Sequence, residues 1–213
     1  MGCLGVHYAI ALNQGGRLWD GDEAARSFAR ELEDEWDDYY RQPTGKAWDA
    51  IHRCLADGTL RWAGGDWPLN GAILGGDPMY LGSGYIIMFL HEDDVAEVAG
   101  ALDQVIQPWF RERFFALPAH GYEGRADEAG FDYTWYWFER MRAFFRKTAD
   151  EGRQLVFTAD QLAGLFYLAW GGSAPGHSRA CATIVVPDSP ATPGTGRRPD
   201  GRCPRSPAAS ARP

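Results

Sequence analysis

The sequence lacks several patterns that identify common classes of protein. The four cysteines are far apart and form no CxxC pair: Cys3, Cys54, Cys181 and Cys203. They suggest neither a zinc site nor a disulfide framework, and this cysteine usage makes the reducing cytoplasm the location that we expect. No run of eighteen apolar residues is present, so we expect no membrane span.

Nucleotide-binding motifs are absent from the most glycine-rich stretch, WPLNGAILGGDPMYLGSGYIIMFL (67–90). After Gly82 and Gly84 the third glycine of a dinucleotide fingerprint is missing, and a strand is expected where a phosphate-binding helix would begin. A Walker phosphate-binding loop needs Gly-Lys-Ser/Thr, but no lysine lies between residues 47 and 146. No GxSxG motif surrounds Ser83, so the stretch does not form the nucleophile elbow of a hydrolase either. We therefore interpret these glycines as turns and close backbone approaches.

The C-terminal segment 171–213 has no aromatic residue and holds eight of the thirteen prolines. Six arginines and two aspartates give it a net charge of +4; the whole chain carries −8, so residues 1–170 carry −12. Such a composition buries too little apolar surface to offset its ordering entropy. We expect one compact domain, 1–170, followed by a disordered tail. The abrupt change also fits out-of-frame reading of GC-rich DNA, which the sequence leaves open.

Within residues 1–170 the hydrophobic pattern alternates between helical and strand-like periods. Apolar residues one turn apart predict helices over 22–40, 43–58, 91–106, 108–117 and 132–152. Short apolar runs predict strands over 3–12, 85–90 and 154–158, and residues 160–170 fit either element. Helix 132–152 is apolar around more than half its circumference, so we expect it to be central and largely buried. The pattern predicts an α+β fold, with a few-stranded mixed sheet packed against several helices.

One histidine lies on an apolar helix face. Trp48, His52 and Leu55 share a face of the predicted helix 43–58. A histidine in that position is most often a hydrogen-bonded core residue, but beside Lys46 it could also act as a general base or contact a ligand. His7, in the first predicted strand, has the same two interpretations.

A binding pocket, if the domain has one, would be lined by residues near this helix and the glycine turns. The candidates are Lys46, Trp48, His52, Gly75, Gly76, Tyr85 and Tyr122, the last from a loop that also holds His120. No serine, cysteine or aspartate is placed beside these histidines by local sequence, so no catalytic residue is named. HEDD (91–94) is explained by a helix's first turn, because consecutive helical residues cannot converge on one ion. We expect neither a metal nor a cofactor.

Charge limits the partners. A domain with a net charge of −12 repels the phosphate groups of nucleic acids, so we expect no nucleic-acid partner. The acidic run ELEDEWDDYY (31–40) is either a solvated helix face or a patch that attracts a basic protein.

A family resemblance is carried by several segments in order. They are KAWDAIHRCLADG, WPLNGAILGG, LGSGY, FLHEDDVAEVAGAL and WYWFERMRAFFRKTADEG followed by QLVFT. Together they resemble the bacterial YfbM-like family (domain of unknown function 1877) over roughly residues 1–160. The matching positions are Lys46, Trp48, His52, Gly75, Gly76 and Gly84, whereas His91 and Glu92 stand where the family often has Thr-Pro. The resemblance implies a small soluble α+β domain and no established activity.

Two functions stay open. A non-enzymatic binding module, such as an immunity-type protein that neutralises a basic toxin, is favoured by the acidic domain and the lack of catalytic motifs. The alternative is a small-molecule-binding domain or an unrecognised enzyme, with a pocket near His52 and the Gly75–Gly76 turn. A His52 side chain sealed in the core, with no cleft beside the turn, would argue against the alternative.

Overall fold

The computed structural model describes residues 4–62, 64–82, 84–118, 122 and 124–160. The chain divides into two units, Met1–Gly172 and Ser173–Pro213, and every described residue belongs to the first. The predicted disordered tail, 171–213, and residues 161–170 of the predicted domain lie outside the described residues.

Five strands form one open sheet in the order β2-β1-β5-β4-β3. Their bounds are β1 Gly5–Ile10, β2 Arg41–Gly45, β3 Asp77–Gly82, β4 Tyr85–Leu90 and β5 Gln154–Asp160. The predicted α+β class is confirmed. Every pairing in the described sheet is antiparallel, however, so the expectation of a mixed sheet was wrong in that detail. Neighbouring strands therefore all run in opposite directions, and the β2-to-β3 connection crosses from one edge of the sheet to the other.

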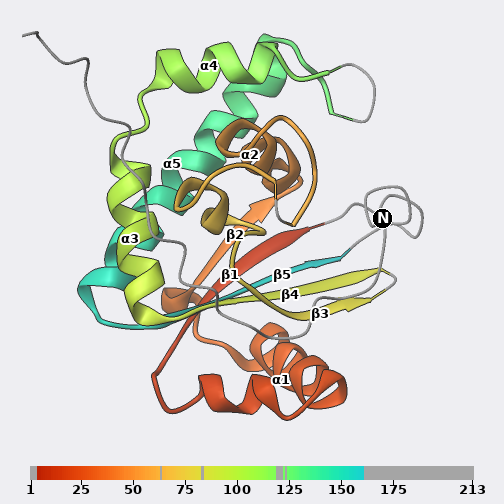
Figure 1. Ribbon diagram of the computed structural model, residues 1–213, viewed down its shortest axis with the longest axis vertical. Coiled ribbons are helices and arrows are strands. Elements are labelled where there is room, and N and C mark those ends of the chain that lie inside the picture. Colours follow the sequence, from red (N-terminus) through yellow and green to blue (C-terminus); the bar gives the residue numbers. More distant parts are fainter. Residues whose placement is uncertain (1–3, 63, 83, 119–121, 123, 161–213) are drawn as a thin grey trace, which may run out of the picture. The chain divides into compact units, whose positions relative to one another are not determined.

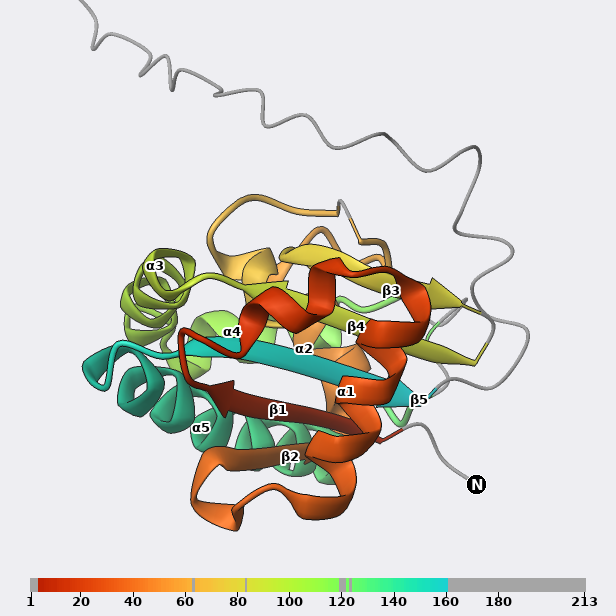
Figure 2. The same cartoon turned by 90° about the horizontal axis from the view of Figure 1, so that it is seen from below.

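Helices cover both faces of the sheet, unequally. The α-helices are α1 Asp22–Glu35, α2 Ala47–Leu55, α3 Glu92–Asp103, α4 Gln107–Phe115 and α5 Glu128–Asp150, with short 3-10 helices η1 Gly15–Trp19, η2 Asp38–Tyr40 and η3 Leu69–Ala72. Helices α2 to α5 lie on one face and α1 lies on the other (Figure 1). Viewed from below, α1 crosses that second face, with the short helix η1 beside it (Figure 2). None of the described helices has the length and apolar character needed to cross a membrane.

Alternation along the strands builds two cores. On β4, Ile86, Met88 and Leu90 join the larger core beneath α2 to α5, while Ile87 and Phe89 join the smaller core beneath α1. Because successive strand residues point to opposite faces, a run in which nearly every residue is apolar can serve both layers. The uncharged run YIIMFL is therefore explained by a strand covered on both sides.

Helix α5 is central, but it is less buried than its sequence indicated. Asp127 caps its first turn by accepting a hydrogen bond from the Gly130 N–H at 2.9 Å. The buried face carries Phe138, whose ring centroid lies 4.8 Å from that of Phe110. The opposite face exposes Tyr133 and Tyr136, because tyrosine counts as apolar in a periodicity yet tolerates water.

Two edge strands were missed by the sequence analysis. The predicted helices 22–40 and 43–58 are shorter than expected, because residues 41–45 form β2 between them. Gly45, at φ +56°, then turns the chain into α2. The other missed strand, β3, contains Pro78 and a register irregularity beside it. Proline is tolerated at a sheet edge, where one side of the strand has no ladder to complete.

The larger core should dominate the stability of the domain. Phe138→Ala removes a fully buried ring and should lower the free energy of unfolding by about 3–5 kcal/mol in urea denaturation. The control Ile106→Ala alters a side chain that is 62% exposed and should change it by no more than about 0.5 kcal/mol. Similar losses in both variants would contradict the layered arrangement.

Candidate functional site

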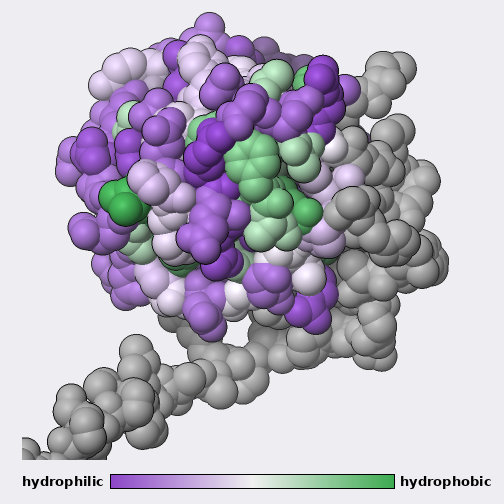
Figure 3. Space-filling view, turned by 90° about the horizontal axis from the view of Figure 1, so that it is seen from above, coloured by the Kyte–Doolittle hydropathy of each residue, from purple (hydrophilic) through white to green (hydrophobic). Residues whose placement is uncertain are grey.

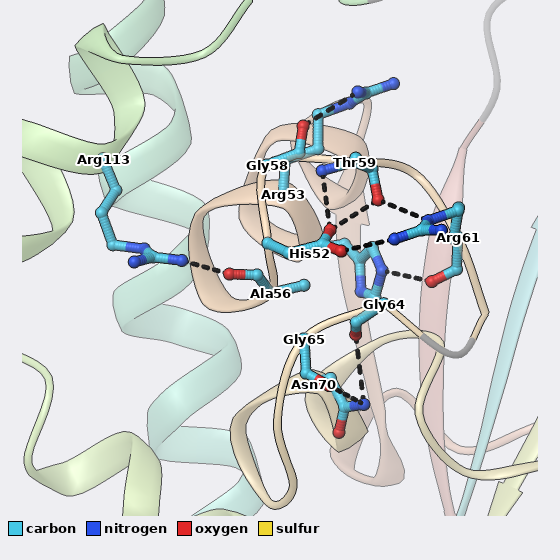
Figure 4. Close-up of polar contacts among 11 residues, drawn as sticks. His52, Arg53, Ala56, Gly58, Thr59, Arg61, Gly64, Gly65, Asn70 and Arg113 are labelled. Atoms are coloured by element: carbon cyan, nitrogen blue, oxygen red, sulfur yellow. Dashed lines mark hydrogen bonds and ion pairs between the residues drawn. The ribbon is translucent and has the colours of Figure 1, made fainter.

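His52 is sealed inside the larger core. It lies on α2, where eight of the nine helical residues are buried, and its own side chain is 0% exposed. Its Nε2 lies 3.0 Å from the carbonyl oxygen of Arg61 (Figure 4). The helix thereby holds the loop that follows it, and no part of the imidazole is exposed to solvent.

Burial fixes the charge state of this imidazole. It lowers the pKa of His52 to about 4, although the bond to Arg61 and the nearby Asp57 act in the opposite direction. If Nε2 donates to the carbonyl oxygen, it carries the ring proton and Nδ1 is unprotonated. Nδ1 is buried and has no hydrogen-bond partner among the described residues. A neutral, enclosed ring of this kind attaches α2 to the following loop and offers no base that solvent or substrate can reach.

The C-terminal end of α2 is held by two arginines. Arg113, from α4, donates to the carbonyl oxygens of Cys54 and Ala56, which the end of the helix would otherwise leave without partners. Arg53 is buried, pairs with Asp49 at 2.5 Å and donates to the Gly58 carbonyl at 3.2 Å. These contacts attach α2 to α4 and to the loop beyond it (Figure 4). The site therefore supports the fold at a junction of three segments.

The loop after α2 contains its own polar network. Asp57 accepts hydrogen bonds from Thr59 and Arg61. Partial burial pushes the pKa of Asp57 upward, but these hydrogen bonds together outweigh it and lower the pKa to about 2. Further along, the Asn70 side chain donates to the Gly64 carbonyl at 3.2 Å (Figure 4). The loop is thus ordered by its own side chains.

The glycine turn lies beside this loop. The Gly75 N–H donates to the Asn70 carbonyl at 2.9 Å, and Trp62 donates to the Gly76 carbonyl at 3.1 Å. A Cβ on Gly75 would lie 2.6 Å from the Asn70 side-chain oxygen, and one on Gly76 would collide with the Phe89 carbonyl. Close backbone approach explains both glycines, as the sequence suggested.

The other predicted pocket residues do not converge on His52. Trp48 is buried on the same helix and packs on Phe157 at 5.9 Å between ring centroids. Lys46 is exposed at the N-terminal end of α2, and Tyr122 packs on Phe114 of α4. Tyr85 lies on the opposite face of the sheet.

Tyr85 belongs to the smaller core beneath α1. Its hydroxyl donates to Glu33, and burial together with this bond raises the pKa of the phenol. Tyr85 therefore attaches α1 to the sheet, on the face opposite the other candidate pocket residues.

The remaining groups singled out in the sequence also have structural partners. His7 is fully buried with Nε2 2.9 Å from the Ala72 carbonyl. His91 occupies the position before α3 without a capping hydrogen bond from its side chain, and its Nε2 lies 3.5 Å from the Asp77 carboxylate. Burial raises the pKa of the Cys54 thiol to about 12, so it remains a thiol. His120 lies outside the described residues. Within the described ranges, no group of three or more His, Cys, Asp or Glu side chains could hold a metal ion.

Two surface features remain; the sequence analysis noted the first only as part of an acidic run and did not identify the second. The first is the acidic terminus, defined here as Glu33, Asp34, Glu35, Asp37 and Asp38. The second is the cationic–aromatic stripe, defined as Lys46, Tyr133, Tyr136, Trp137 and Arg140. The i, i+3, i+4, i+7 spacing of the last four was the signal for the stripe, but it was interpreted as part of a buried face.

Comparisons with known proteins agree with the fold. A family model, domain of unknown function 1877 (DUF1877), matches residues 1–158. The chain belongs to this family. Its structure is similar to that of YfbM from Escherichia coli, a protein of unknown function, with a TM-score of 0.58 and 16% identity over 73% of this chain and 99% of that one. A likeness at this identity shows the fold alone, and no curated protein matches the sequence.

Acid should destabilise the domain through its two buried histidines. Burial lowers the pKa of His7 and of His52 to about 4, below the unfolded value of 6.5, so the unfolded chain takes up protons first as pH falls. Stability is then full above pH 6.5 and decreases by about 2 kcal/mol per histidine between pH 7 and pH 5. In urea denaturation, His52→Gln should reduce this pH-dependent loss by about 2 kcal/mol. An unchanged loss would show that His52 is not buried as a neutral ring.

The glycine turn gives a second stability test. Gly76→Ala should lower the free energy of unfolding by roughly 1–3 kcal/mol, because the Phe89 carbonyl must move. Gly100→Ala is the matched control: nothing lies near its Cβ on α3, so it should stabilise the domain by roughly 0.5–1 kcal/mol. Differential scanning fluorimetry ranks the two against the parent chain, and equal melting temperatures would refute the close approach.

Proposed function

We propose that this protein is a non-enzymatic binding module whose acidic terminus docks a basic protein. The observation that carries the proposal is the position of these carboxylates. Glu33, Asp34 and Glu35 form the last residues of α1, which has no basic residue in its last turn. Carboxylates at the negative end of a helix dipole destabilise the helix. Glu33 offsets this by accepting a hydrogen bond from the Tyr85 hydroxyl, whereas Asp34 and Glu35 form no ion pair with another described residue.

Two other acidic residues of α1 are neutralised locally. Glu31 pairs with Arg17 at 2.5 Å, and Glu23 pairs with Arg26 at 3.5 Å. In the acidic terminus, Asp38 pairs with Arg41 at 2.5 Å, whereas Asp34 and Glu35 make no ion pair with another described residue. The excess negative charge of the helix is therefore concentrated at one end.

Aromatic side chains adjoin this charge. Tyr39 is 59% exposed, and Trp36 is half-buried at the end of α1. Tyrosine and tryptophan are enriched at protein interfaces, where they supply contact area at low entropic cost. Acidic groups around such anchors speed association with a basic partner and select it over other proteins.

The surroundings of His52 support this function over the alternative of a small-molecule site. A ring that is 0% exposed offers neither a reachable base nor a ligand contact. The predicted pocket residues also lie on both faces of the sheet and at the surface. The immunity-type interpretation is the finer form of the proposal, in which the basic partner is a toxin.

Affinity capture from the native host tests the proposal. The immobilised full chain should retain a basic protein at low salt and release it at high salt, because exposed charge pairs are screened. Asp34→Asn/Glu35→Gln should abolish retention of that protein, identified by mass spectrometry. The control Asp66→Asn/Glu112→Gln changes the net charge equally at other exposed positions and should retain it. A partner that binds the parent chain and the first variant alike would exclude the acidic terminus.

A further inference from the structure

The cationic–aromatic stripe is an exposed face of α5. Tyr133, Tyr136, Trp137 and Arg140 follow the spacing of one helix face, and the two tyrosines are 45% and 51% exposed. Lys46 joins them from the N-terminal end of α2, where its backbone N–H donates to the Tyr133 oxygen at 3.3 Å. The described surface seen from above is mostly hydrophilic, with apolar residues gathered near its centre (Figure 3). Exposed aromatic rings that lie next to one another, as in the stripe, indicate a contact surface.

The stripe presents positive charge and hydrogen-bond donors. Arg140 lies over the rings of Tyr136 and Trp137, at 5.5 and 5.9 Å from their centroids. Neither Lys46 nor Arg140 forms an ion pair with another described residue. Such a surface suits a partner with carboxylates.

Asp37 and Asp38 of the acidic terminus lie just before β2, at the opposite end of that strand from Lys46. Next to them, Tyr39 contacts Lys147 on α5, whose ammonium lies 3.0 Å from the ring centroid. The stripe instead surrounds Tyr133, which precedes Lys147 on the same helix by about 21 Å at the α-helical rise per residue. Strand β2 runs between the two ends and is an edge strand of the sheet (Figures 1 and 2).

We propose that this side of the domain is a two-fold interface between two copies of the chain, in which the acidic terminus of each copy docks on the cationic–aromatic stripe of the other. A two-fold axis across a side that is negative at one end and positive at the other pairs opposite charges twice. Both complementary surfaces belong to this chain, so the second copy supplies the carboxylates that the stripe lacks. The exposed tyrosines at both ends provide the contact area.

This inference rests on the acidic terminus being a contact surface, as in the proposed function, and a basic partner would compete with the second copy for it. The interaction is chiefly electrostatic between exposed groups, so it should weaken as salt is added. Its test uses the purified full chain alone. A monomer would therefore overturn the dimer and leave the capture of a basic partner to stand or fall by its own experiment.

Sedimentation equilibrium is the first measurement. The chain should dimerise at low ionic strength, and its dissociation constant should rise at least tenfold in 500 mM NaCl. A monomer at every protein concentration, or a dimer indifferent to salt, would overturn the proposal.

Reciprocal charge reversal tests the geometry. Lys46→Glu/Arg140→Glu and Asp34→Lys/Glu35→Lys each create like charges across the interface, so each variant should be monomeric. Mixed together they restore both charge pairs, and a heterodimer should form. All four side chains are exposed, and circular dichroism verifies that both variants fold. The control Asp66→Lys/Glu112→Lys matches the second variant in charge and should stay dimeric. Failure of the mixture to associate, or dimerisation of either variant alone, refutes the arrangement.

Discussion

The position of β5 is the constraint on which the rest of the domain depends. It lies between β1 and β4, so the N-terminal strands and the β3–β4 hairpin are joined in one sheet only through it. Six of its seven residues are buried, with Phe157 in the larger core and Val156 in the smaller. Both layers of helices therefore pack on a surface that is complete only when the last described strand has paired. Long-range pairing of this kind makes the core cooperative, because neither layer has a full sheet to cover without it.

The periodic elements of this arrangement were predictable, and its edges were not. Helix α3 and strands β4 and β5 carry apolar residues at the spacing of their own faces, and the structure confirms them close to the predicted bounds. Strand β2 contains Pro43 among polar residues and Gly45, and β3 begins with Asp77-Pro78 and ends at Gly82, which are residues typical of turns. They are strands because a neighbour offers its backbone groups, which no local pattern records.

The candidate site shows the same division between local and spatial information. Helical spacing placed His52 on a buried face, and that face is buried. Its partner is a backbone carbonyl nine residues away, and a carbonyl has no signature in the sequence. The acidic character of residues 31–40 was visible, whereas the selective neutralisation by Arg17 and Arg26 depends on how α1 packs and pairs. Tyrosines on α5 were assigned to the core because a periodicity cannot distinguish a buried ring from an exposed one.

Core and surface consequently obey different rules in this domain. In the interior, His7 and His52 each have a backbone carbonyl near one ring nitrogen. Gly75 and Gly76 lie where a Cβ would collide with a neighbouring group. Outside, the acidic terminus opposes the dipole of its own helix, and the stripe leaves two cations without carboxylates among the described residues. Each arrangement leaves charged side chains without an opposite charge among the described residues, and each would be stabilised by a surface of the opposite charge. Because β2 links the two surfaces at an uncovered edge of the sheet, whatever binds one of them also approaches the other.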